Sequence, residues 1–239
     1  MDILTDMTIR TTAIAALVVA ILVGMTSNLL FLAAFQFRTD WFLEPTRALG
    51  AGSTSAELLR WASALDLVGY YLASAVLAYA LWRVLRPRNP LLADLSTMAA
   101  IGYVLAGGAG AAALAMVGPM LMNDYVVAAS SADQAVIASQ FGLLFEIVWR
   151  SIWQLLDGIL VAGWWLGIGL LVRPEQPGLA RLSLVLSAVA AMGVFFTLVG
   201  LDLARDLSLG MVFSLWTAWW VWLLLLFLRR QEPFVADFA

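Results

Sequence analysis

The side chains of this sequence best suited to chemistry are polar residues that interrupt long apolar stretches. They comprise Asn28, Asp66, Tyr70, Glu146, Arg150, Gln154, Asp157 and Asp202. Asp66 and Tyr70 are four residues apart, a spacing that places both on one face of a helix. Glu146, Arg150 and Asp157 share a face by the same rule. A charged side chain costs at least ~2.5 kcal/mol at the centre of a membrane-spanning helix, so such residues are functional candidates by default.

Three aspartates of this set and Asn28 lie at similar depths when a rise of about 1.5 Å per residue is counted from the nearest arginine-rich turn. We therefore predict that the eight residues form an outward-opening polar vestibule, with Arg205 and Asp206 at its rim. Buried carboxyl groups in such a place suit general-acid chemistry or proton-coupled movement. The alternative is a structural ion-pair network that holds the helices together.

Tryptophan is abundant, with 11 residues. Five of them are candidates for an aromatic wall, namely Trp153, Trp164, Trp216, Trp219 and Trp220. Such a wall would suit a flat apolar ligand in a cavity. Packing between helices or contact with lipid is the alternative role for these indole rings.

The missing residue types limit the chemistry further. The 239 residues include no His and no Cys, and all 13 basic residues are Arg. Schiff-base, thiol and Ser–His–Asp chemistry are therefore excluded, as are bis-histidine haem, iron–sulfur clusters and zinc sites with His or Cys ligands. The sequence has no spaced metal motif, phosphate loop or basic patch, so we predict no metal site, no cofactor and no nucleic-acid partner.

The elements that position these residues are apolar helices. Only 12% of the residues are charged and 63% are hydrophobic, so most of the apolar surface must face lipid. Six stretches are long enough to cross a bilayer as helices, at about residues 11–37, 61–82, 91–117, 152–172, 182–201 and 209–228. We predict an all-α fold in which one domain, residues 1–239, is a bundle of six transmembrane helices.

The fourth helix is expected to begin well before its apolar stretch. Ser131 followed by Gln134 resembles a capping box, which predicts a helix from about residue 132 to Val172. About 40 residues span about 60 Å, which is twice the thickness of the hydrocarbon core. The first turns of this helix must therefore project beyond the membrane or lie along its surface.

Arginine placement predicts the orientation. Eight of the 13 arginines lie in short loops and tails on one side of the predicted bundle, among them Arg10, Arg88 and Arg173. Because positive residues accumulate in cytoplasmic loops, both termini are predicted to be cytoplasmic.

Small residues recur at four-residue spacing in the third stretch, in the pairs Ala106/Gly110 and Ala109/Ala113. Such pairs let helix backbones approach closely in lipid. They favour packing within the bundle, and a homodimer or another membrane partner is the alternative.

The order of several features resembles the DUF4386 family of bacterial membrane proteins. These features are the fourth span from Glu146-x-x-Trp149 to Asp157, the turn Arg173-Pro174, the run 179–183 (LARLS) and an aromatic sixth span that ends with Trp222 to Arg230. The resemblance implies a six-span protein of the bacterial cytoplasmic membrane. It implies no activity, because the function of that family is uncharacterised, and it assigns no site residue.

The leading hypothesis is a non-enzymatic integral membrane protein, with the lipid bilayer as its surroundings. It would bind or pass a small amphiphilic or apolar ligand through the vestibule, or act as an accessory subunit. One alternative is an intramembrane enzyme that acts on a lipid or isoprenoid, with Asp66, Glu146 or Asp157 as acid or base. The other is a structural subunit of a larger membrane complex.

Overall fold

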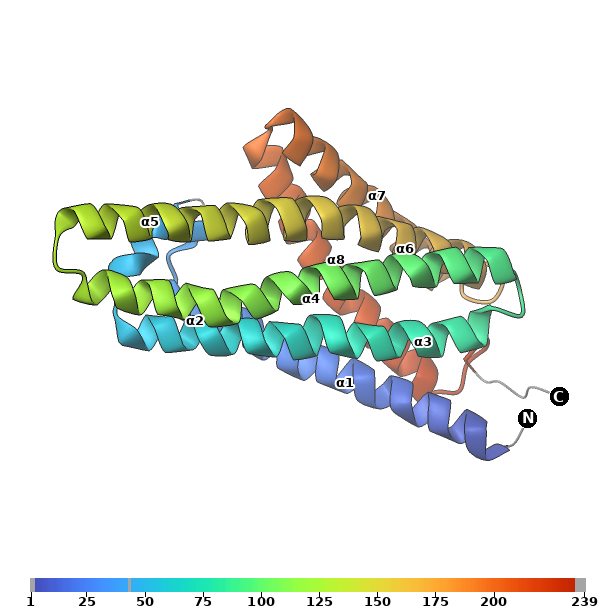
Figure 1. The fold of residues 1–239 in the computed structure, drawn as a ribbon. Coiled ribbons are helices and arrows are strands. Elements are labelled where there is room, and N and C mark those ends of the chain that lie inside the picture. The colour runs from blue at the N-terminus through green and yellow to red at the C-terminus, as the bar shows by residue number, and fades with distance from the viewer. Residues whose placement is uncertain (1–2, 43, 235–239) are drawn as a thin grey trace.

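The apolar stretches form long helices in the computed structural model, which describes residues 3–42 and 44–234 (Figure 1). Within these residues, six helices are long and apolar enough to cross a membrane. The predicted all-α, six-helix architecture is therefore confirmed.

Four of the six long helices consist of a single element. They are α1 (Ile3–Ala34), α4 (Pro90–Val127), α7 (Pro177–Val199) and α8 (Asp202–Leu228). The other two each contain a π-helical segment. The second helix joins α2 (Ser53–Asp66), the π-helix η3 (Leu67–Leu72) and α3 (Ala73–Leu85), and the fourth joins α5 (Ser131–Phe145), the π-helix η4 (Glu146–Leu156) and α6 (Asp157–Val172).

Helix ends differ from the apolar stretches because capping groups, and not hydropathy, determine them. The third helix starts at Pro90, where the Asn89 side chain accepts a hydrogen bond from the Leu92 amide over 3.1 Å. The first helix ends at Ala34, three residues before the predicted end, because Gln36 and Phe37 adopt left-handed backbone conformations.

The predicted start of the fourth helix near residue 132 agrees with the observed start of α5 at Ser131. The capping residue is Ser130, however, and the prediction of a cap by Ser131 and Gln134 is wrong. Ser130 has an extended backbone, and this lets its hydroxyl oxygen accept from the Asp133 amide over 3.1 Å. Gln134 instead donates to the carbonyl of Tyr125.

The fourth helix continues in line through α5, η4 and α6, beside α4, and the turn between α4 and α5 projects past the rest of the bundle (Figure 1). The first turns of this helix therefore run straight on from the rest of it, and their projection beyond the membrane stays a prediction. A helix of 38 residues such as α4 is about 57 Å long, well beyond the thickness of a hydrocarbon core.

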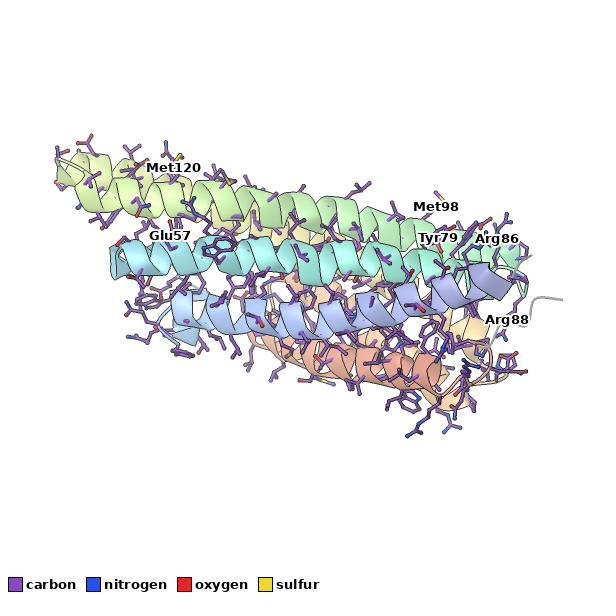
Figure 2. The ribbon with its side chains drawn as sticks, turned by 90° about the horizontal axis from the view of Figure 1, so that it is seen from below. Glu57, Tyr79, Arg86, Arg88, Met98 and Met120 are labelled. Carbon is purple, nitrogen blue, oxygen red and sulfur yellow. The ribbon has the colours of Figure 1, made fainter. Side chains whose placement is uncertain are left out.

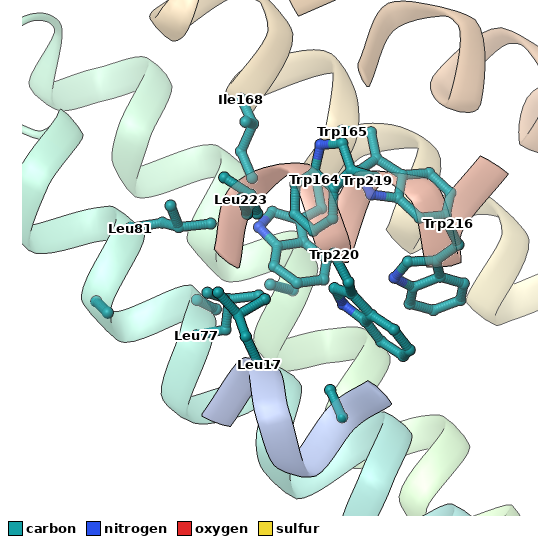
Figure 3. Packing of buried hydrophobic residues seen from close by; sticks show 14 of the residues in the cluster. Leu17, Leu77, Leu81, Trp164, Trp165, Ile168, Trp216, Trp219, Trp220 and Leu223 are labelled. Atoms are coloured by element: carbon teal, nitrogen blue, oxygen red, sulfur yellow. The ribbon is translucent and has the colours of Figure 1, made fainter. Parts of the chain in front are cut away.

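The six long helices form a closed ring. Around it, α1 packs on α2, α2 on α4, α4 on α6, α6 on α7, α7 on α8, and α8 on α1. Two apolar clusters fill the ring. One, in Figure 3, contains Trp164 and Trp165 of α6 with Trp216, Trp219 and Trp220 of α8. The other lies toward the projecting end and includes Phe35, Leu59, Phe141 and Phe145.

The arginine-rich turns lie at the end of the bundle where α1 begins and α8 ends. Arg10 Nε donates to the carbonyl of Phe227 over 2.8 Å. Arg88, between α3 and α4, forms an ion pair with Glu175, between α6 and α7, at 2.7 Å. Figure 2 shows Arg86 and Arg88 at this end and Glu57 toward the other. We call the first of these the arginine end.

Candidate ligand-binding cavity

A cavity of about 330 Å³ lies inside the ring, where the two apolar clusters meet. All six long helices contribute to its lining. Most of the lining is apolar or aromatic, with Phe31, Tyr103, Trp153, Val161, Val212 and Trp216 among its members. Natural ligand sites are typically cavities of roughly 300–1,000 Å³ lined by apolar side chains and a few polar groups.

Two aspartates line this cavity, and each lies at an end of a π-helical segment. Asp66 is the last residue of α2 before η3, and Asp157 is the first residue of α6 after η4. Both side chains are buried. In a π-helix the backbone hydrogen bonds run between residues five apart, so the turns are wider, and such segments occur frequently at functional sites.

A glycine lets a third helix approach the Asp157 carboxyl group. The hydroxyl of Tyr71 donates to Asp157 Oδ2 over 3.2 Å. A Cβ atom at Gly107 of α4 would overlap both the Tyr71 ring and Asp157 Oδ2. The carbonyl of Gly107 also accepts from Trp153 Nε1 over 3.2 Å. Glycine at this position therefore brings η3, α4 and the fourth helix together around one carboxyl group.

Several polar atoms of the lining have no hydrogen-bond partner within the described residues. Asp157 Oδ1 and both polar atoms of the Gln154 side chain are buried and unpaired. Among the described residues, none donates a hydrogen bond to the Asp66 carboxyl group. None forms an ion pair with Asp66 or with Asp157. Buried polar atoms are normally satisfied, so an unpaired set facing a cavity is a mark of a ligand site.

Other polar side chains of the lining are paired among themselves. The amide of Asn28 donates to the Tyr70 hydroxyl over 2.8 Å, which connects α1 to η3. The Tyr103 hydroxyl donates to the Tyr70 carbonyl over 3.4 Å. Tyr70 also packs edge-on against Trp216, with ring centroids 5.5 Å apart. These contacts hold aromatic rings from three helices around the cavity.

The eight predicted vestibule residues divide into two groups. Asn28, Asp66, Tyr70, Gln154 and Asp157 line the cavity. The other three do not. Glu146 and Arg150 form a half-exposed ion pair with each other at 3.5 Å, and Asp202 pairs with Arg205. Arg150 pairs with neither Asp66 nor Asp157, because η4 carries its side chain away from the cavity.

The five predicted wall residues divide in the same way. Trp153 and Trp216 line the cavity. Trp164, Trp219 and Trp220 are buried in the apolar cluster of Figure 3 instead, where Trp219 Nε1 donates to the Ser183 hydroxyl over 2.8 Å. The cavity has further aromatic lining from Tyr71, Tyr103, Trp149 and Phe213, none of which was predicted as a wall residue. The adjacency of Tyr71 to Tyr70 is the one sequence signal that could have pointed to it.

Arg205, expected at the rim, is buried and lines the cavity. Its three guanidinium nitrogens face acids on its own helix. Nη1 donates to Asp202 Oδ1, and Nε and Nη2 both lie 2.9 Å from Asp206 Oδ1. The positive charge of Arg205 is therefore compensated by two more exposed carboxylates and not by the aspartates of the cavity.

The described part of the loop between α1 and α2 adjoins the cavity at the end away from the arginine end. The short helix η1 (Thr39–Phe42) places Phe42 in the lining and against Trp149, with ring centroids 5.3 Å apart. Arg38 donates two hydrogen bonds to the Asp40 carboxylate, at 3.0 and 3.1 Å. This interaction holds the pKa of Asp40 below its usual value.

Within residues 3–42 and 44–234, no group of three or more acidic residues is arranged to hold a metal ion.

The small residues of the third helix pack inside the bundle only in part. Gly107 and Gly110 of α4 face the fourth helix, whereas Ala109 is exposed.

The fold and the cavity define the class of protein, an integral membrane protein of six spanning helices around an aromatic-walled cavity. Comparisons with protein-family models, with curated proteins and with solved structures find no match. The resemblance to the DUF4386 family therefore stays a prediction.

Proposed function

We propose that this protein is a non-enzymatic membrane protein that binds, or passes, a small amphiphilic or apolar ligand through the cavity. The observation that carries the proposal is the combination of a cavity of about 330 Å³ with aromatic walls and unpaired polar atoms. Apolar walls supply affinity through burial of the ligand, and a few polar groups fix its orientation.

The orientation of the cavity follows from the arginines. The positive-inside rule assigns the arginine end to the cytoplasm, and the cavity lies away from the arginine end. We therefore propose that both termini are cytoplasmic, that the cavity belongs to the outer half of the membrane, and that the membrane is the bacterial cytoplasmic membrane implied by the DUF4386 resemblance.

An intramembrane enzyme is the second candidate, and one observation favours it. Asp66 and Asp157 are buried carboxyl groups in a single cavity, an arrangement that can supply both an acid and a base. It would act on a lipid or isoprenoid. Under this alternative, Asp157→Asn abolishes turnover of the substrate while the variant still binds it.

Saturable binding tests the proposal. Purified protein in nanodiscs is titrated with a tritiated aromatic hydrocarbon, and partitioning into empty nanodiscs is subtracted. Ala190 lines the cavity, and Ala190→Phe is expected to remove binding by filling it. The matched control Ala112→Phe lies on an exposed face of α4 and should bind as the native protein does. The absence of saturable binding to the native protein would contradict the proposal.

A further inference from the structure

The charge balance of the cavity points to a class of ligand. Asp66 and Asp157 line it without a cationic partner among the described residues, and Arg205 directs its guanidinium nitrogens toward Asp202 and Asp206. The cavity therefore offers two carboxyl groups that no basic side chain of the described chain pairs with.

Two unpaired acceptors point the same way, beside two unpaired donors of the lining, Gln154 Nε2 and Trp216 Nε1. Asp157 and Gln154 are 5% and 7% exposed, and both line the cavity. Asp157 Oδ1 and the Gln154 carbonyl oxygen are acceptors that lack a donor. Leaving buried acceptors unpaired costs free energy, which a ligand that brings donors or positive charge would recover.

The aromatic walls suit such a ligand as well. Trp153 of η4 and Trp216 of α8 bound the cavity from different helices, and Tyr71 adds a third ring from η3. The face of an aromatic ring attracts a cation, by ~2 kcal/mol or more where water is excluded. Aromatic faces with a nearby carboxylate form the usual recognition pattern for substituted ammonium groups.

From these observations we infer that the ligand of the cavity is an organic cation, an amine or quaternary ammonium group joined to an apolar body. The inference rests on the proposed function, because it names the ligand class for the same cavity. The apolar body would occupy the region near Val161 and Val212, and the positive group would lie beside Asp157 and Asp66.

The test compares two probes of the same shape. Benzyltrimethylammonium carries a positive charge, and neopentylbenzene is its uncharged isostere. Both are titrated against the full-length protein in nanodiscs of uncharged lipid, with empty nanodiscs subtracted. We expect the cation to bind at least about tenfold more tightly than the hydrocarbon, as a desolvated cation–π contact and a carboxylate together require.

Variants locate the charge that is recognised. Asp157→Asn and Asp66→Asn keep the shape of each side chain and are expected to weaken binding of the cation by at least about tenfold while leaving the hydrocarbon unaffected. Asp124→Asn is the matched control, since Asp124 is an exposed acid of α4 outside the lining. It should leave both affinities unchanged. Retention of hydrocarbon binding shows that each variant is folded.

The outcomes separate the two proposals. Equal or tighter binding of neopentylbenzene would overturn the cation inference and leave the proposed function standing. Saturable binding of neither probe would overturn both. Tight binding of the cation that survives both aspartate substitutions would overturn the assignment of the acidic groups.

Discussion

Replacement of Gly107 by alanine tests how the cavity is assembled. In the structure α4 approaches η3 and α6 so closely at this glycine that an added Cβ would lie 2.6 Å from Tyr71 Cζ and closer still to Tyr71 Cε1 and Asp157 Oδ2. Ordinary contacts begin near 3.4 Å, so the helices or these side chains must move by about 1 Å. A movement of that size disrupts the hydrogen bond from the Tyr71 hydroxyl to Asp157.

Two costs combine to give the expected magnitude. Overpacking of a well-packed interior costs typically 1–3 kcal/mol, and loss of a partner for a buried polar atom costs ~1–3 kcal/mol. Because one movement can relieve part of both, we expect Gly107→Ala to lower the free energy of unfolding by about 2–4 kcal/mol. Binding of the tritiated aromatic hydrocarbon should weaken in parallel, since Tyr71 and Asp157 also line the cavity.

Reversible unfolding in mixed micelles, followed by tryptophan fluorescence, measures this difference. Gly210→Ala is the matched control, because a Cβ at Gly210 of α8 meets no atom within 4 Å. Alanine is the better helix former by roughly 1 kcal/mol, so the control should be neutral or slightly stabilising. If Gly107→Ala unfolds at the same denaturant concentration as Gly210→Ala, the close approach of α4 is not required and the reasoning fails.

Three further predictions use the same protein. Tyr71→Phe removes the hydroxyl that donates to Asp157 and should cost ~1–3 kcal/mol in the same unfolding assay, a result that equal stability would contradict. Gly69→Ala should cost ~1–3 kcal/mol, because its Cβ would lie 2.8 Å from a backbone Cα of α1, which cannot yield as a side chain can. Hydrogen bonds from Arg38 lower the pKa of Asp40 in the folded protein. The interaction between Arg38 and Asp40 therefore stabilises the loop fully above the unfolded-state pKa of ~3.9, and this stabilisation is lost as pH falls through the lower pKa of the folded state. Amide exchange in this loop should therefore lose protection at acid pH in the native protein, and Asp40→Asn should remove that pH dependence.

The number of helices and the length of the fourth could be predicted because they depend on local properties. Lipid demands long apolar helices, and the start of the fourth helix near residue 132 was predicted from a serine cap, although the capping residue is Ser130 and not Ser131. The depth count placed Asn28, Asp66, Asp157 and Asp202 at one level. The structure brings the first three to one cavity, whereas Asp202 lies outside it. Depth along a helix requires only a constant rise per residue.

The face of a helix on which a residue lies was harder to predict. Spacing in the sequence gives the face only if every turn of the helix has the same number of residues. Glu146, Arg150 and Asp157 share a face only if the helix is regular. In η4 the turns are wider, because the backbone hydrogen bonds of a π-helix join residues five apart. Glu146 and Arg150 therefore lie outside the cavity that Asp157 lines, and the spacing of polar residues does not reveal a π-helix.

The tryptophans show a second limit. Trp216 and Trp220 are four residues apart on α8 and pack against each other, with ring centroids 5.3 Å apart, yet only Trp216 reaches the cavity. Which of two neighbouring rings borders an empty space depends on the opposing helices, and this information is not present in the local sequence.

The projecting turn between α4 and α5 has a practical consequence for imaging this protein. A membrane protein of 25.9 kDa offers little density outside the micelle for aligning particles in an electron microscope. Here α4 continues outward to Val127 and α5 begins at Ser131, and only residues 128–130 connect them. A rigid marker protein fused through continuous helices at this turn would report the orientation of the whole bundle, and it would lie several helical turns from the cavity.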